Sequence, residues 1–340
     1  MENNILEKII SNKKAEEAGK LNAIKVVNHL FDDLLERERD VLSRRFGLHG
    51  DKSETLEKIG GLHKLTRERV RQIEATSIKK LKKLDNLDQY LETIKNVVGQ
   101  LLTSHGGLMP QDYLLDILAT FCADGKNSEG ERESYKKHFD FLISRLLEDD
   151  FEKVEKSDHF ETFYKNKEQA IGHLEEVAKE LRANIEKAKQ TMNIGTLIDL
   201  IKNLDAFNKN VGKLGEGNPV DLTSIFKHEV FPEAGEVINS NKVLYSLINA
   251  IKNLDRNKFG DWGLNSWPEV KPKKISDKIY LVLKKSGEPM HFTEIANKIN
   301  EVGFDAKKAN PGTCHNELIL DDRYVLVDRG MYGLKEWQNK

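Results

Sequence analysis

The sequence has few of the residues that mark disulfide-linked, metal-bound or membrane-embedded folds. It holds two cysteines and seven prolines among 340 residues, and aromatic residues make up 7% of it. Cys122 and Cys314 stand far apart without a CxxC partner, which argues against a disulfide framework and fits a reducing cytoplasm. No run of about 18 apolar residues occurs, so we expect no membrane-spanning segment. The start, MENNILEKIISNKK, is amphipathic and contains acidic residues, so we expect no signal peptide.

Motifs of catalytic sites are missing as well. The sequence has no P-loop, no GxSxG, no HExxH and no glycine-rich dinucleotide turn. His291 and His315 have no further potential ligand nearby, and neither cysteine has the spacing of a zinc site. We therefore predict a protein that is not an enzyme and has no catalytic residues, no cofactor and no metal ion.

Positive charge is concentrated between Thr55 and Lys83. The whole chain has 54 Lys and Arg against 56 Asp and Glu. This segment alone holds nine of the basic residues and only three glutamates, so the remainder of the chain is acidic. Such a basic stripe is typical of a surface that meets an anionic partner, for example nucleic acid.

The pattern within this segment predicts two helices and a turn. Leu56 and Ile59 indicate a short helix, and GGLHKL, with Gly60 and Gly61 near its start, is expected to form the turn. A second helix should begin at the N-cap Thr66. Its apolar positions recur at three- and four-residue steps: Val70, Ile73, Ser77 and Leu81.

The opposite face of the second helix holds side chains that suit DNA. In a recognition helix the first turns meet base edges, where Arg can bind guanine, Gln adenine and Glu cytosine. Lysines further along suit phosphates, which position the protein without specifying sequence. The pattern alone leaves open a solvated face with i,i+4 charge pairs. The predicted DNA-binding residues are Thr66, Arg67, Glu68, Arg69, Arg71, Gln72, Lys79, Lys80 and Lys83.

The stretch from Leu34 to Leu84, LLERERDVLSRRFGLHGDKSETLEKIGGLHKLTRERVRQIEATSIKKLKKL, resembles region four of the primary (sigma-70 type) sigma factors of bacterial RNA polymerase. The family's ERE.VL..RFGL helix pair, its TLEEIG helix and its recognition helix appear in order and without a gap. The resemblance implies that Arg67, Glu68, Arg71 and Gln72 read and grip the −35 promoter element. It also implies docking on the flap of the polymerase β subunit, with core packing as the alternative, by the stretch that contains Leu35, Val41, Leu42 and Phe46.

The sequence departs from a complete sigma factor before this stretch. ILEKIISNKKAEEAGKLNAIKVVNHLF is expected to form one or two helices and has a single aromatic residue at its end. No counterpart of sigma region two, which melts the −10 element with aromatic residues, is found there. The stretch before region four therefore does not predict the activity of a complete sigma factor, and a divergent sigma factor stays one of the alternatives.

The C-terminal stretch from Ile275 to Trp337 predicts three helices and a β-hairpin. The second helix should end at Gly303, Thr313 should cap the third, and the hairpin should turn at Arg329-Gly330. The elements GEPMHFTEIANKI, TCHNEL, DRYVLV and MYGLKEW resemble the HARE-HTH domain, a winged helix found in the delta subunit of bacterial RNA polymerase and in chromatin and restriction-system proteins. The resemblance implies binding of protein or of DNA.

The middle of the chain contains an echo of this stretch. DWGLNSW at 261–267 is similar to MYGLKEW at 331–337, and helical patterns precede both. We interpret the middle as two divergent winged-helix units, joined by a helix around Ile171 to Ile185; a helical bundle with a hairpin is the alternative. The expected domains are 1–30 (N-terminal helical segment), 31–86 (helix-turn-helix), 87–167 (possible winged helix), 168–192 (linker helix), 193–271 (possible winged helix) and 272–340 (HARE-HTH winged helix).

These features together predict a mainly α fold with a helix-turn-helix domain followed by winged-helix-like units. The main hypothesis is a bacterial transcription factor, cytoplasmic and nucleoid-associated, that acts at initiation. Its expected partners are double-stranded DNA with a −35-like element and RNA polymerase, as core or holoenzyme, and no membrane. The alternatives are a delta-like polymerase accessory subunit, a divergent sigma factor, and a DNA-binding arm of a restriction or nucleoid system.

Overall fold

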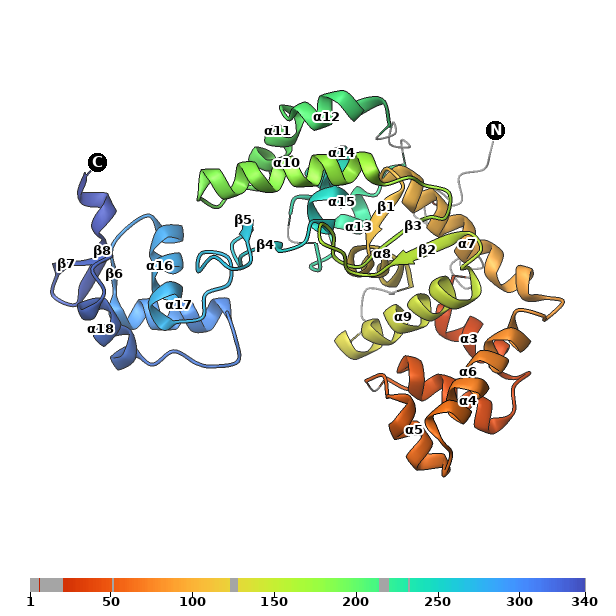
Figure 1. Cartoon of the computed structure of the whole chain (residues 1–340). Helices are drawn as coiled ribbons and strands as arrows, with labels where there is room; N and C mark the ends of the chain where they lie inside the picture. Colours follow the sequence, from red (N-terminus) through yellow and green to blue (C-terminus); the bar gives the residue numbers. More distant parts are fainter. Residues whose placement is uncertain are drawn as a thin grey trace. The chain divides into compact units, whose positions relative to one another are not determined.

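A computed structural model describes residues 6, 21–50, 52–122, 128–213, 220–231 and 233–339. The chain divides into two compact units, Met1–Ala178 with Leu204–Lys252, and Lys179–Asn203 with Asn253–Lys340. Helices dominate both units and the sheets are small and antiparallel, as predicted (Figure 1). Among the described residues, no helix is long and apolar enough to cross a membrane.

In the first unit, the helix-turn-helix module has α3 (Ala23–Phe31), α4 (Glu36–Phe46), α5 (Leu56–His63) and α6 (Arg67–Leu81). Asn22 caps α3 by accepting a hydrogen bond from the Lys25 amide, and Gly47 ends α4 in the left-handed conformation. The predicted N-terminal segment, 1–30, lies outside the described residues except for Leu6 and the residues from Leu21 onward.

The next part of the first unit, residues 87–167, is named here the first helix–wing segment. Its helices and strands are α7 (Leu87–Ser104), β1 (Leu108–Pro110), α8 (Gln111–Cys122), α9 (Glu129–Phe141), a π-helical turn η1 (Leu142–Leu146), β2 (Phe151–Val154) and β3 (Phe163–Asn166). The sheet has the order β1-β3-β2. The segment thus contains helices and a small antiparallel sheet, and its assignment as a winged-helix unit stays a prediction.

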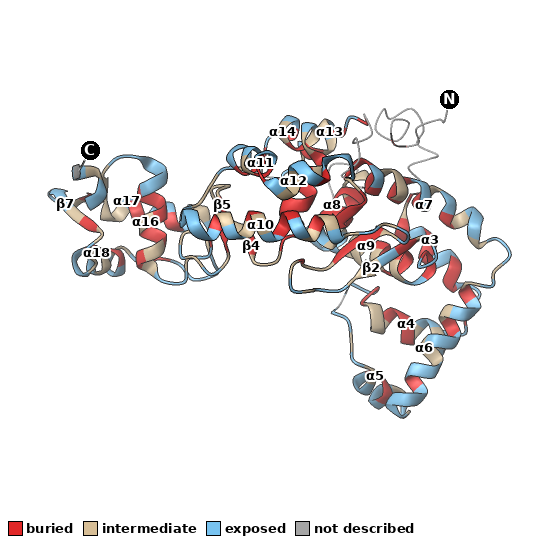
Figure 2. Cartoon of the chain, turned by 45° about the horizontal axis from the view of Figure 1, so that its top comes forward, coloured by how far each residue is buried: buried red, intermediate tan, exposed pale blue. Residues whose placement is uncertain are grey.

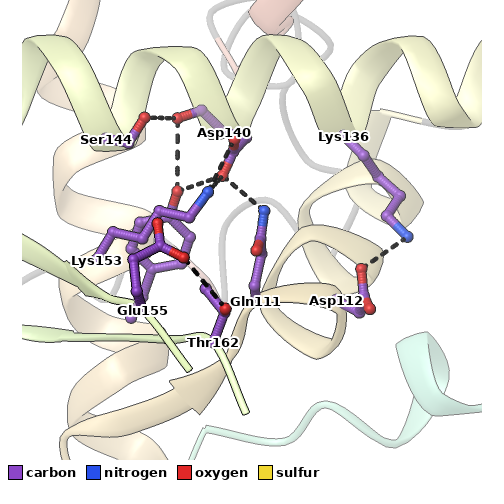
Figure 3. A network of polar contacts seen from close by, with 9 residues as sticks. Gln111, Asp112, Lys136, Asp140, Ser144, Lys153, Glu155 and Thr162 are labelled. Carbon is purple, nitrogen blue, oxygen red and sulfur yellow. Dashed lines mark hydrogen bonds and ion pairs between the residues drawn. The ribbon is translucent and has the colours of Figure 1, made fainter. Parts of the chain in front are cut away.

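Asp140, near the end of α9, holds this segment together. Its carboxylate accepts hydrogen bonds from Gln111 Nε2 at 2.9 Å, Lys153 Nζ at 2.8 Å and Tyr164 OH at 2.5 Å. The three donors come from α8, β2 and β3, so one partly buried carboxylate joins two helices to the wing (Figure 3).

Five further helical elements complete the described part of the first unit, and the last of them packs against the sheet of this segment. They are α12 (Asp205–Asn210), η2 (Val211–Lys213), α13 (Thr223–Phe226), α14 (Gly235–Ser240) and α15 (Lys242–Ala250). Ser246 of α15 donates a hydrogen bond to the Leu108 carbonyl of β1 at 2.6 Å. The rings of Tyr113 and Tyr245 lie 5.4 Å apart, so an aromatic core lies between α8 and α15.

α10 (Gly172–Ala188) contributes residues to both units, and the second unit continues with α11 (Ile194–Lys202), β4 (Leu254–Arg256) and β5 (Trp262–Leu264). Met192, which the sequence placed at the end of a linker helix, forms an antiparallel bridge with Trp262 of β5. Asn193 then caps α11 through its side chain. The division of residues 168–271 into a linker and a winged unit stays a prediction.

The end of the second unit, residues 275–339, is named the last helix–wing segment. It has α16 (Ile275–Ser286), β6 (Met290–His291), α17 (Phe292–Val302), α18 (Pro311–Leu320), β7 (Tyr324–Asp328), β8 (Met331–Leu334) and η3 (Lys335–Asn339), with the sheet order β6-β8-β7. Its buried core includes Ile279, Ile295 and Tyr332, with Trp337 packed against it. The predicted end of its second helix at Gly303 is confirmed, and α16 ends at Gly287.

The predicted cap of α18 is wrong. Asn310, not Thr313, accepts the hydrogen bond from the Gly312 amide, and Pro311 occupies the first helical position. Proline fits there because it lacks an amide that would need a partner, and its φ is already helical. Thr313 has the right chemistry but lies inside the helix.

Among the described residues, an antiparallel pairing of a methionine with an aromatic residue occurs three times, twice within a sheet and once as an isolated bridge to β5. Met109 is paired with Tyr164, Met192 with Trp262, and Met290 with Tyr332. In each case the methionine lies two positions before the first residue of a helix, which is α8, α11 or α17. The similar sequences DWGLNSW and MYGLKEW also share a packing contact. In each of them, a Cβ on the glycine would lie 2.8–3.2 Å from the ring of the tryptophan four residues later. These shared contacts favour an internal repeat.

Candidate nucleic-acid interface

Two caps define the helix-turn-helix. The Thr55 hydroxyl accepts from the Lys58 amide and begins α5, and the Thr66 hydroxyl accepts from the Arg69 amide and begins α6, each at 3.2 Å. The start predicted for the second helix at Thr66 is therefore confirmed. The Thr66 hydroxyl is thus already occupied by the Arg69 amide, although the sequence also predicted that Thr66 contacts DNA.

The turn falls within the predicted stretch GGLHKL but begins only at its end. Gly60 and Gly61 belong to α5, which runs to His63, and Lys64 makes the reversal in the left-handed conformation with φ 54°. Gly60 is needed because a Cβ there would lie 2.6 Å from the Leu65 carbonyl oxygen. The glycine thus allows the turn to approach the helix closely, where the sequence had suggested a helix break.

A small apolar core sets the angle between the two helices. Val41, Ile59 and Val70 are fully buried and come from α4, α5 and α6. Ion pairs extend the same contacts: Arg45 of α4 lies 3.4 Å from Glu74 of α6. The face of α6 opposite this core is consequently turned to solvent (Figure 2).

Asp40 links α4 to the end of α5. It accepts hydrogen bonds from Arg44 Nε at 2.8 Å and lies 2.7 Å from His63 Nε2. Burial raises the pKa of the Asp40 carboxyl, but the hydrogen bonds with Arg44 and His63 outweigh it and hold the pKa below its usual value. The contribution of this carboxylate to stability is thus present at neutral pH and is lost as the pH falls through its lowered pKa.

The side chains predicted to read bases are all exposed at the start of α6. They form one polar network: Arg71 donates two hydrogen bonds to Glu68, at 2.8 and 2.7 Å, and Arg69 donates one to Gln72 at 3.2 Å. The hydrogen bond from Arg71 lowers the pKa of Glu68, which keeps the carboxylate charged. Arg67 lies 3.6 Å from Glu57 of α5.

This network can rearrange on DNA at little cost. Exposed ion pairs contribute about 0–1 kcal/mol, because water screens them and both side chains lose entropy. The guanidinium groups of Arg67 and Arg71 can therefore exchange their glutamate partners for guanine or phosphate acceptors. The sequence could not show that Glu68 orients Arg71, since a three-residue spacing fixes only the face and not the rotamer.

The predicted phosphate-binding lysines differ in their surroundings. Lys79 and Lys83 are exposed, and no ion pair joins them to another described residue. Lys80, by contrast, is paired with Glu38 of α4. The neighbouring Lys82 is partly buried and lies 2.5 Å from Glu148 of the first helix–wing segment. Lys79 and Lys83 are thus the more available cations.

The four residues predicted to dock on polymerase lie in different environments. Leu35 is 69% exposed, whereas Val41 and Leu42 are fully buried in the module. The ring of Phe46 is 4.9 Å from that of Phe141 of α9, and the Arg145 guanidinium lies 5.4 Å from the centre of the Phe46 ring. Burial leaves Val41 and Leu42 no surface for a partner, so they act in the core.

Comparison with known proteins finds similarity over the helix-turn-helix part of the chain. Residues 30–83 match the family model "Sigma-70, region 4". The chain is also similar to the RNA polymerase sigma factor SigA of Lactococcus lactis subsp. cremoris, with 50% identity over 56 residues, and to RpoD of Helicobacter pylori, with 53% over 57 residues. Each alignment covers 16% of this chain, and 15% and 8% of the two relatives. No solved structure matches the chain.

Residues 30–83 therefore resemble region 4 of the sigma-70 factors, and their helix-turn-helix has the sequence-predicted helices. The chain spans about a seventh of the length of the SigA proteins that it matches, and the family model ends at residue 83. It extends to neither helix–wing segment. The likeness of the last segment to the HARE-HTH family stays a prediction.

Proposed function

We propose that this chain is a DNA-binding transcription factor that acts at initiation and is not an enzyme. The observation that carries the proposal is the exposed row of Arg67, Glu68, Arg71 and Gln72 on the first turns of α6, in a module that matches sigma-70 region 4. These side chains would enter the major groove of a −35-like element, and Lys79 and Lys83 would contact phosphates. RNA polymerase, as core or holoenzyme, is the proposed protein partner.

The aromatic residues favour a role beside a complete sigma factor rather than in place of one. Proteins that capture unstacked bases use exposed aromatic side chains. All Phe, Tyr and Trp residues of this chain fall within the described residues, and none of them is exposed. The chain would thus bind duplex DNA and modulate a holoenzyme. A polymerase accessory subunit that reads no sequence is the second candidate, which the HARE-HTH resemblance of the last segment favours.

Selection of random duplexes by the purified full chain tests the proposal. Enrichment of a TTGACA-like motif would support sequence reading by α6. The same selection with Arg71→Ala should lose the preference, because this residue has the geometry for bidentate binding of guanine. Tight binding of polymerase without any enriched motif would instead support the accessory subunit, and enrichment that is unaffected by Arg71→Ala would contradict the assignment of α6.

A further inference from the structure

Exposed apolar side chains gather on two adjacent elements of the last helix–wing segment. Among the described residues, seven large hydrophobic side chains are exposed, and four of them lie at the end of α18 and on β7. The exposed fractions of these four are 61% for Ile319, 79% for Leu320, 59% for Leu326 and 57% for Val327. We name these four side chains the α18–β7 patch. Concentrated apolar exposure of this kind marks interaction surfaces.

The patch is poorly suited to DNA. α18 stands where a winged helix has its recognition helix, yet its sequence, PGTCHNELIL, has no Lys or Arg. Its exposed polar residues include Thr313 and Asn316, and Asp322 follows in the next turn. Binding to a phosphate backbone depends on cations, so the chemistry of α18 favours a protein partner.

β7 also offers unpaired backbone groups. It is an edge strand, because the sheet has the order β6-β8-β7 and β8 covers only one side of it. The outward amide and carbonyl groups of such a strand can pair with a second chain, and Leu326 and Val327 would then be covered by the same contact.

The helices that precede the other two hairpins, α9 and α15, are covered by other parts of this chain, unlike α18. α9 precedes β2, and its Tyr135 and Phe141 are buried; Phe141 lies 5.8 Å from Phe31 of the helix-turn-helix module. α15 precedes β4 and packs on β1 through Ser246. α18 precedes β7, but only Cys314 and Leu318 are buried along it. In the first two cases another module of this chain covers the helix.

Charges beside the patch make it complementary to itself. Arg329 and Asp322 are both exposed, and no ion pair joins either to another described residue. In a two-fold symmetric contact the same patch serves both partners, so the Arg329 of one copy has an unpaired carboxylate available on the other. We propose that two copies of this chain associate through α18 and β7, whether or not α6 reads DNA.

The mass of the full chain in solution tests this inference. Sedimentation and light scattering between about 1 and 100 μM, where moderate complexes dissociate, should show a rise from one chain to two. Leu326→Lys should weaken association by at least about tenfold, because it places a charge in the apolar contact. Val211→Lys is the matched control, since Val211 is 56% exposed on η2 and should leave the mass unchanged.

A charge swap checks the electrostatic part. Arg329→Glu should weaken association, and Arg329→Glu combined with Asp322→Arg should restore it in part. Thermal unfolding of each variant should be unchanged, since the altered side chains are exposed. A wild-type chain that stays monomeric over the whole range would overturn the inference, as would a dimer that Leu326→Lys and Val211→Lys affect equally. A monomer whose patch variants lose polymerase binding would overturn it too and would make polymerase the occupant.

Discussion

The Lys80 ammonium lies 2.5 Å from a carboxylate oxygen of Glu38, and this contact joins the last turns of α6 to α4. Burial raises the pKa of Glu38, but hydrogen bonds from Lys80 and from the Leu35 amide outweigh it, so the pKa lies below its usual value. The Glu38 carboxylate is therefore charged at neutral pH. Lys80 is held by the module itself, whereas Lys79 and Lys83 are not.

This difference predicts unequal salt dependence. Lys83→Ala should weaken binding to all duplexes alike and reduce the slope of log affinity against log salt by about one unit, because one phosphate contact is lost. From the sequence the same is expected of Lys80→Ala, but the structure predicts a smaller change, since Glu38 already neutralises that charge. Titrations at several salt concentrations measure both slopes. Equal slopes for the two variants would show that the Glu38 pair opens fully on DNA.

A second prediction concerns base readout. Arg67→Ala or Gln72→Ala should each lose about 1–3 kcal/mol on the preferred site and relax the preference at one base pair. Arg182→Ala on α10 is the control, because Arg182 is a partly exposed arginine paired with Glu186 on its own helix. Affinities for the selected site and for single-base variants provide the measurement. Unchanged preference in Arg67→Ala would remove this residue from the reading face.

The two adjacent glycines of α5 give a matched pair for stability. Gly60→Ala should destabilise the module by about 1–3 kcal/mol, because its Cβ would collide with a backbone oxygen that cannot move without opening the turn. Gly61→Ala meets no atom within 4 Å and should stabilise the helix by about 0.5–1 kcal/mol. Chemical denaturation of both variants measures the difference. The same sign of change in both would contradict the helical placement of Gly60.

A fourth prediction concerns promoter opening. Flipping a base costs a few kcal/mol, and aromatic platforms normally offset this with about 1–3 kcal/mol per base. Phe31 and Phe46 lie at apolar positions of α3 and α4 and pack against Phe141, so they offer no platform. With core polymerase as its only partner, the chain should therefore not open a −10 element. Permanganate footprinting of promoter DNA measures this, and reactive thymines in that mixture would identify a divergent sigma factor.

The local sequence determined the helices of the module and the face that α6 presents. A helix has 3.6 residues per turn, so the spacing of Val70, Ser77 and Leu81 fixed the buried side and thereby placed Arg67 and Arg71 opposite. Thr66 was recognisable as a cap because its hydroxyl acts within three residues. The hairpin around Gly330 was predictable for the same reason: alternation and a turn residue are local signals.

Only the tertiary structure decided which of these groups are free. The pairing of Lys80 with Glu38 spans 42 residues, and the contact of Phe46 with Phe141 spans many more, so no local pattern encodes them. Gly60 was misread because its role depends on how closely the Leu65 carbonyl approaches it. The exposure of Leu326 likewise depends on which helices cover the sheet. Local hydrogen bonding and periodicity determine the elements, whereas the packing of distant segments determines which surfaces remain available to a partner.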